Sequence, residues 1–329
     1  MDRGVALDGH DPTLQQTSWR RTAAPVAKLR PGERLRVRVP DSSSGQLTPR
    51  SRGIDLASLD MTRVDAAVGP IEIVGARAGD RLDVSIRRLR TGPWGWSGVF
   101  RDFGLLRDRF DDDLQHWTLG PRSARPAGGF LPDVRIPTRP MLGWVGLAPA
   151  EGTHPMIPPR RSGGNLDHRL VGVGATLSLP VEVDGALLSL GDPHAAQGDG
   201  EVSGTGIETS AEVELDVALR PGRAPPMPFL TANRPVAHAG PVVAGLGIGP
   251  DLHLAAVSAL EGLLAGLEDR GIPAKAGYVL ASVAGELRIS EAVDMPNFVV
   301  SASYPIRLLP GRTGVKSRRT SPPRKGSRR

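Results

Sequence analysis

The sequence predicts a mainly β, sandwich-like fold with a few helices, of which the longest lies near residues 251–270. Three observations support this prediction. The 329 residues include 41 Gly and 31 Pro but few aromatic side chains, which suits short elements joined by many turns. Several segments alternate apolar and polar residues with the period of a strand. One segment near the C-terminal end has the period of a helix instead.

The clearest strands follow turns that contain glycine. In "PGERLRVRV" (residues 31–39) and "AGDRLDVSI" (residues 78–86), apolar residues alternate with charged ones after an acidic turn, which suggests a weak internal repeat. A short apolar stretch at residues 71–73 ("IEI") leads into the turn before the second of these two strands. At residues 211–218, "AEVELDVA" alternates so regularly that we expect a strand with one face exposed.

The segment at residues 91–117 alternates poorly and contains three of the five tryptophans. We interpret it as a long loop or lid with a short helical piece from Leu105 to Phe110. Its residues Trp94 and Trp96 either cover a pocket or pack onto the core as part of a surface loop.

The helix near residues 251–270 has both of its ends marked. Asp251 is a suitable N-cap and Gly271 a suitable terminator. Its apolar stripe is expected to consist of the following residues: Leu254, Val257, Leu260, Leu264 and Leu267. A second short helix is expected from Ala274 to Val283, before the chain returns to strands.

We expect one compact domain over residues 17–310, after a flexible lead at residues 1–16 and before a disordered basic tail at residues 311–329. The chain has 41 Lys and Arg against 35 Asp and Glu. The tail holds eight of the basic residues and no acid, so the remainder, with 33 basic and 35 acidic residues, has a net charge of −2. Nucleic-acid binding is therefore not expected, except weakly through the tail.

Composition also excludes several kinds of site. Cysteine is absent, so disulfides, thiolate zinc sites and cysteine nucleophiles are excluded. No apolar run reaches the ~20 residues of a membrane span, and the N-terminal residues lack the apolar core of a signal peptide. The expected location is the cytoplasm, without a membrane partner.

The densest group of ionisable residues lies in "GDPHAAQGDGE" (residues 191–201). On an extended segment, Asp192 and His194 point to the same face and form a partial site for zinc or another divalent ion. Asp199 and Glu201 repeat this spacing. Surface pairs and ordinary turns have the same local patterns, so spacing alone leaves open whether this block is a site.

A second segment, "RSGGNLDHR" (residues 161–169), adds further candidates. Asp167 is a candidate third metal ligand. Asn165 is a candidate anchor for a substrate or a partner of a metal ligand.

Both segments resemble those of the acetamidase/formamidase family. "GGNLDHR" and "GDPHAAQGDGEVSGTGIE" are similar to its most specific blocks, and "GPIEIVGARAGDRL", "WGWSGVFRDFGLLRDRF" and "LRISEAVDMPNFVVSA" are similar to further segments. The resemblance spans residues 17–308. The segment "RVDAAVGPI" departs from the family pattern, as do Leu166, Ser203 and Gly206, so substrate choice here is open.

The resemblance implies a mainly β, homo-oligomeric enzyme that hydrolyses small linear amides with a divalent metal, often zinc, and releases ammonia and a carboxylate. It implies that Asp167, Asp192 and His194 hold or neighbour the metal. On this hypothesis Glu201 is the general base, Asp199 a second catalytic acid, and Asn165 and Gln197 bind the amide. The alternative is a catalytically silent relative that binds a small amide or metal and uses its tail for interactions.

Overall fold

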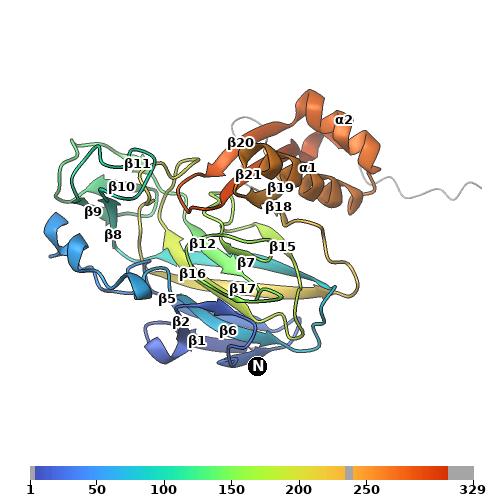
Figure 1. Ribbon diagram of the computed structural model, residues 1–329, viewed down its shortest axis with the longest axis horizontal. Coiled ribbons are helices and arrows are strands. Elements are labelled where there is room, and N and C mark those ends of the chain that lie inside the picture. Colours follow the sequence, from blue (N-terminus) through green and yellow to red (C-terminus); the bar gives the residue numbers. More distant parts are fainter. Residues whose placement is uncertain (1–3, 234–239, 310–329) are drawn as a thin grey trace, which may run out of the picture.

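Two large β-sheets share one hydrophobic core, which confirms the predicted sandwich (Figure 1). The computed structural model describes residues 4–233 and 240–309, so the basic tail at residues 311–329 lies outside the described residues. The nine-stranded sheet has the spatial order β1 (Gly4–Asp8), β5 (Arg34–Val39), β17 (Ala211–Arg220), β7 (Arg81–Thr91), β15 (Thr176–Pro180), β18 (Phe229–Ala232), β19 (Val242–Gly249), β21 (Phe298–Pro305) and β20 (Glu286–Glu291). The six-stranded sheet has the order β14 (Gly163–Asn165), β12 (Met141–Gly146), β16 (Leu188–His194), β6 (Ala67–Ile73) and β2 (Gln15–Gln16), with β4 (Ala27–Leu29) also paired to β6.

The core lies between these sheets because each strand turns its apolar side chains inward. Leu35, Val84 and Leu215 come from the larger sheet, and Ile71 and Leu190 from the smaller one. The two strands of the suspected repeat, β5 and β7, both pair with β17 and flank it. Along β17 buried and more exposed residues alternate, as the sequence predicts.

Two smaller sheets complete the β-structure. A four-stranded sheet has the order β11 (Ile136–Pro137), β10 (Ser123–Pro126), β9 (Asp113–Leu119) and β8 (Trp94–Val99), and β13 (Thr153–His154) pairs with β3 (Trp19–Arg20). The prediction of a long loop at residues 91–117 was therefore wrong at both of its ends, where β8 and β9 pair as a hairpin. Residues 105–110 form turns and not the expected helical piece. The glycines in "WGWSG" let β8 pack closely against neighbouring segments. They also interrupt the alternation of apolar and polar residues by which a strand is recognised in a sequence.

Two α-helices cover one end of the larger sheet, beside β19 and β21 (Figure 1). They are α1 (Leu252–Glu268), capped by the side chain of Asp251, and α2 (Ala274–Ala284). Both confirm the predicted helices.

The predicted apolar stripe of α1 was correct at its C-terminal end and wrong at its N-terminal end. Leu267 is buried and Leu260 packs against the same cluster, whereas Leu254 and Val257 are exposed and the rest of the buried face consists of alanine, glycine and Leu263. The physical reason is close packing: a Cβ at Gly247 of β19 would lie 1.8 Å from the carbonyl oxygen of Ala255. A helix this near to a sheet must present small residues, so the larger ones face outward.

The predicted flexible lead is ordered over its described residues, which corrects that expectation. β1 pairs in parallel with β5, and β2 pairs with β6. Val5 and Leu7 pack against the core, and this apolar contact offsets the cost of ordering the segment. Short 3-10 helices connect the strands: η1 (Pro12–Leu14), η2 (Gly53–Ser58), η3 (Met61–Arg63) and η4 (Ile306–Leu308).

None of the helices in the described part of the chain is both long and apolar enough to cross a membrane.

Candidate active site

A cavity of about 370 Å³ ends at a buried group of acids around His194. Chain segments that are far apart in sequence meet there. β16 ends in Asp192 and His194, β14 ends in Asn165, and the loop after β14 carries Asp167. Turns after β16, after β5 and after β20 supply the other acids, so the site forms only when the two large sheets are assembled.

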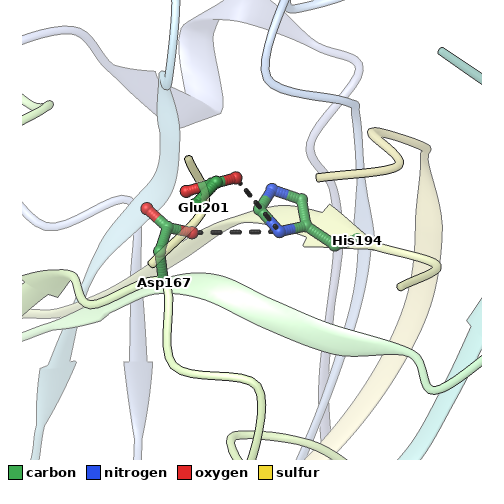
Figure 2. Close-up of side chains that lie close together, drawn as sticks. All are labelled: Asp167, His194 and Glu201. Atoms are coloured by element: carbon green, nitrogen blue, oxygen red, sulfur yellow. Dashed lines mark ion pairs between the residues drawn. The ribbon is translucent and has the colours of Figure 1, made fainter. Parts of the chain in front are cut away.

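The ring of His194 is the centre of this group, and both of its nitrogens have partners. Nε2 lies 3.0 Å from Oδ1 of Asp192 and 2.9 Å from Oε2 of Glu208. On the other side, Nδ1 lies 3.9 Å from Oδ1 of Asp167 and 3.8 Å from Oε1 of Glu201 (Figure 2). One imidazole thus stands between two pairs of carboxylates.

The side chain of Gln197 determines which ring nitrogen carries a hydrogen. Its amide nitrogen donates to the backbone carbonyl of Asp167 at 2.5 Å, and its amide oxygen lies 2.8 Å from Nδ1 of His194. A carbonyl oxygen only accepts, so the amide is fixed with its oxygen toward the ring. Nδ1 therefore carries a hydrogen, so that whenever the ring is neutral its lone pair is on Nε2, which faces Asp192 and Glu208.

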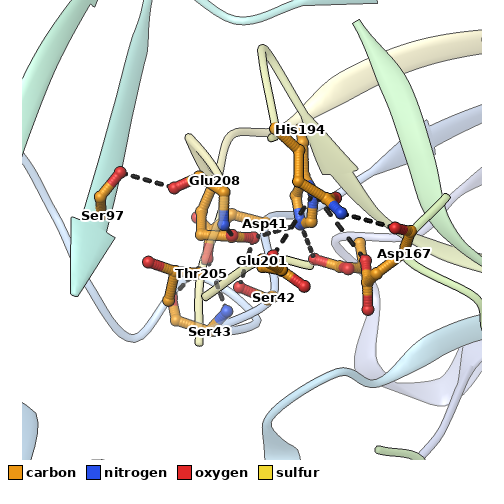
Figure 3. Close-up of polar contacts among 12 residues, drawn as sticks. Asp41, Ser42, Ser43, Ser97, Asp167, His194, Glu201, Thr205 and Glu208 are labelled. Carbon is orange, nitrogen blue, oxygen red and sulfur yellow. Dashed lines mark hydrogen bonds and ion pairs between the residues drawn. The ribbon is translucent and has the colours of Figure 1, made fainter. Parts of the chain in front are cut away.

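Glu208 is held in place by contacts that Figure 3 displays with those of the neighbouring polar residues. The hydroxyl of Ser42 donates to Oε2 at 2.9 Å, and the backbone N–H of Gly206 donates to Oε1 at 2.7 Å. Both oxygens of this buried carboxylate are thus oriented toward fixed partners. Such support is typical of a carboxylate that binds an ion.

The acids of the site repel one another and are removed from water. Burial first, and then the neighbouring charge of Asp192, raise the pKa of Asp167 to about 7. Burial likewise raises the pKa of Asp192 to about 6, against the opposing effect of His194. Burial and then the charge of Asp167 raise the pKa of Glu201 well above its usual range. Burial lowers the pKa of His194, but Asp192 and Glu208 raise it to well above its usual range.

The backbone is unusual at four of these acids. Asp65, Asp167, Asp192 and Glu201 have φ angles of 55°, 38°, 50° and 44°, in the left-handed region that residues other than glycine seldom adopt. Each residue in this region raises the free energy of the folded protein by on the order of 1–3 kcal/mol, and such conformations concentrate at functional sites. The surrounding sheets therefore hold the carboxylates in positions that local preferences oppose.

Gly143 of β12 allows two carboxylates to approach each other. A Cβ at this position would lie 2.1 Å from Oδ2 of Asp192 and 2.3 Å from Oδ1 of Asp167. Any other residue would displace one of the two acids, so glycine is required here by the site and not by a turn.

The structure brings together most of the residues that the sequence singled out. Asn165, Asp167, Asp192, His194 and Glu201 all line the cavity. Gln197 does not line it, and its side chain is instead bonded to His194 and to the backbone of Asp167.

The expectation that Asp199 belongs to the site is wrong. Its carboxylate pairs with Arg169 at 2.8 Å and with Arg288 at 3.0 Å, and it does not line the cavity. The physical reason is the turn at residues 198–201. Gly200 and Glu201 both have positive φ, so residues two apart do not share a face as they would on a strand.

Sequence reasoning missed three buried acids that line the cavity, namely Asp65, Glu208 and Asp294. Burial is the main cause that raises the pKa of Asp65 and of Asp294 well above the usual range. Glu208 follows the central block closely, so its proximity to His194 was a usable signal. The other two lie more than 90 residues from His194 in sequence, and no local spacing connects them to it.

The residues present fit a divalent cation. Two groups have ligand atoms within 4.8 Å of one another: Asp167, His194 and Glu201, and Asp192, His194 and Glu208. Oδ1 of Asp167 is buried without a hydrogen-bond partner, so it can accept from a water molecule or another group held by an ion at this site. Carboxylates and one imidazole are the donors of zinc and of harder divalent ions.

Comparison with known proteins identifies the family of the chain. The sequence profile of the Acetamidase/Formamidase family matches residues 8–156 and 150–309. An acetamidase of Mycolicibacterium smegmatis is 26% identical over 67% of this chain and 68% of its own, and a formamidase of Methylophilus methylotrophus is 26% identical over 61% and 63%. The chain spans about two thirds of the length of the curated relatives that it matches.

Solved structures extend the match to nearly the whole chain. The crystal structure of an acetamidase from Bacillus halodurans superposes with a TM-score of 0.81 at 29% identity, and covers 92% of this chain and 98% of its own. A predicted acetamidase/formamidase from Thermoanaerobacter tengcongensis superposes with a TM-score of 0.80 at 28% identity, over 92% and 96%. The chain belongs to the acetamidase/formamidase family.

Proposed function

We propose that this protein is a metal-dependent amidase that hydrolyses the carbon–nitrogen bond of a neutral amide and releases ammonia and a carboxylate. The observation that carries the proposal is the group of buried acids around His194 at the end of the cavity. No lysine or arginine of the described residues lines this cavity to neutralise them. One histidine cannot neutralise this many buried carboxylates, whereas a bound cation would compensate them.

For the ligands we propose Nε2 of His194 with Asp192 and Glu208. This set follows from the hydrogen on Nδ1, which the bond to Gln197 fixes and which leaves Nε2 free to bind an ion. Zinc is the proposed ion because a histidine among carboxylates suits it. When bound, it would supply a polarising charge for the amide carbonyl and lower the pKa of a water molecule.

Asn165 is suited to recognise the amide group of the substrate. Its Nδ2 donates to Oδ2 of Asp294 at 2.9 Å, which orients the side-chain amide. Its Oδ1 is buried and has no hydrogen-bond partner. A primary amide would donate an N–H to this acceptor and satisfy it, whereas an ester would leave it unsatisfied.

Glu201 is the proposed general base. It lines the cavity, and its raised pKa makes it a better proton acceptor than an exposed glutamate. It takes a proton from the attacking water as the water oxygen bonds to the carbonyl carbon. Glu201 then passes that proton to the nitrogen, the carbon–nitrogen bond breaks, and ammonia leaves with a carboxylic acid behind it.

The test combines metal analysis with ammonia release from acetamide and larger amides. Exhaustive chelation should abolish the activity and added zinc should restore it. Glu201→Gln should remove the activity of the zinc-loaded protein, while Glu212→Gln, at an exposed position of β17, serves as the matched control. Full activity after chelation and in Glu201→Gln would refute the proposal.

We also propose that the protein forms a homo-oligomer through α2 and β20. β20 is the edge strand of the larger sheet, so its outer backbone groups can pair with a second copy. Beside it, Tyr278, Val283 and Leu287 are 60%, 73% and 59% exposed. Light scattering would measure the mass in solution, and Val283→Asp together with Leu287→Asp should lower it to that of one chain.

A further inference from the structure

The cavity has two chemically different halves. The inner half carries the acids around His194. The outer half is mainly apolar apart from Asp102 and Asp112, and its apolar wall comes from η2, η3, the segments on either side of η3 and the turn after β8. The apolar residues that line it are Leu56, Ala57, Leu59, Met61, Val64, Phe100 and Phe103.

The size of the cavity exceeds what a very small amide requires. An apolar cavity of about 150 Å³ holds benzene, which corresponds to about 25 Å³ for each carbon atom. Acetamide has only four non-hydrogen atoms, so by the same measure it would fill about 100 Å³. The cavity has about 370 Å³. After an amide group and one water molecule of about 30 Å³ are placed, roughly 250 Å³ is left, enough for six to ten carbon atoms.

The apolar wall is incompletely covered by the protein itself. Met61 is 57% exposed, and Leu59, Val64 and Phe103 are each partly exposed, although all four line the cavity. An apolar group that lay against them would remove this surface from water, which is favourable. A small polar amide would leave it exposed.

The charges at the cavity select against anions. Asp102 and Asp112 line its outer part, and no basic side chain of the described residues does. A carboxylate on the substrate would meet these two acids without a compensating cation. The apolar half thus suits an uncharged hydrocarbon group.

We infer that the preferred substrates are primary amides with an uncharged apolar group of about five to ten carbon atoms, bound with the amide at Asn165 and the hydrocarbon against η2 and η3. This inference rests on the proposed amidase function and adds the substrate class. Acetamide and formamide would be poor substrates of the same site.

The experiment measures ammonia release by the zinc-loaded protein from acetamide, butanamide, hexanamide and cyclohexanecarboxamide, with the monoamide of adipic acid as an anionic control. Each methylene that becomes buried should raise kcat/KM about fourfold. The kcat/KM for hexanamide should therefore exceed that for acetamide by about two orders of magnitude. The kcat/KM for the monoamide of adipic acid, which has the same chain length, should be at least tenfold lower than that for hexanamide.

Substitutions in the apolar wall test whether this wall causes the preference for hexanamide over acetamide. Ala57→Phe fills the apolar half and should reduce the ratio of kcat/KM for hexanamide over acetamide at least tenfold. Ile54→Phe, on the same 3-10 helix, is the matched control because Ile54 is 73% exposed and does not line the cavity. Met61→Asp, at an exposed position that tolerates a charge in the fold, should reduce the same ratio.

The outcomes separate the two proposals. If no amide releases ammonia, the amidase function itself is refuted, and the substrate class with it. If acetamide is hydrolysed as well as hexanamide or better, the amidase function stands and this inference is overturned. An unchanged ratio in both Ala57→Phe and Met61→Asp would overturn the assignment to the cavity wall.

Discussion

Without metal, the protein should become less stable as the pH rises from 5 to 8. The carboxyl groups of the site have raised pKa values in the folded state, so the folded protein holds protons that the unfolded chain has already lost. Stability falls with pH wherever the folded state binds more protons. The raised pKa of His194 acts in the same direction above its ordinary value of 6.5.

The magnitude follows from the pKa values and from 1.36 kcal/mol for each pKa unit. Asp167, with a pKa of about 7, contributes about 3 kcal/mol over two pH units, and Asp192, with a pKa of about 6, contributes about 1 kcal/mol. Burial raises the pKa of Glu291 to about 8, which contributes about 4 kcal/mol. Burial lowers the pKa of His168 to about 4, which opposes the trend by about 2 kcal/mol below pH 6.5.

These four groups together give a loss on the order of 6 kcal/mol between pH 5 and pH 8, and the raised pKa values of Asp65, Glu201, Asp294 and His194 act in the same direction. At about 2 °C for each kcal/mol in a chain of this size, the Tm should fall by on the order of 10 °C. Differential scanning calorimetry of the chelated protein at several pH values measures this. Added zinc at pH 8 should recover the Tm, because an ion that binds only the folded state stabilises it.

The control is Asp167→Asn, which removes one titrating carboxyl and keeps a side chain that tolerates positive φ. In the chelated state at pH 8 it should be more stable than the unchanged protein, and its Tm should vary less with pH. A Tm that stays constant or rises from pH 5 to pH 8 in the chelated protein would refute this electrostatic account.

Three further predictions concern single residues. Glu201→Gln in the zinc-loaded protein should lower kcat for hexanamide by 10²–10⁴-fold while the far-UV circular dichroism stays the same, and a loss below tenfold would remove its role as base. Gly143→Ala should weaken zinc binding, measured by competition with a chromogenic chelator, because its Cβ would lie 2.1 Å from Oδ2 of Asp192; unchanged affinity would contradict the proposed ligands. Gln197→Leu should lower zinc affinity 10–100-fold, because His194 then loses the acceptor that holds its hydrogen on Nδ1, and Gln197→Glu should restore most of it.

The sequence contained enough information for the centre of the site but not for its periphery. Asp192 and His194 both belong to β16 and meet at the ring of His194, so the spacing of two located them although Asp192 itself has a φ of 50°. The same period failed for Asp199 and Glu201, because the chain turns between them. A spacing of two residues predicts that two side chains share a face only if both residues lie on a strand.

Topology accounts for the acids that were missed. Asp65 reaches the site because it precedes β6, the neighbour of β16, and Asp294 because it follows β20 at the edge of the other sheet. Such pairings depend on contacts between sheets that no local pattern encodes.

The four acids whose φ angles lie in the left-handed region have a consequence for attempts to engineer this protein. At each of these positions, Asp65, Asp167, Asp192 and Glu201, a glycine would relieve the backbone strain and remove a buried carboxylate. Such a variant would lose its site but would resist heat better than the unchanged protein. A selection for thermal stability alone would therefore enrich inactive variants at these four positions. A screen for robust catalysts from this scaffold should score turnover in the same round, and should confine its mutations to regions remote from β14, β16 and the turn at residues 198–201.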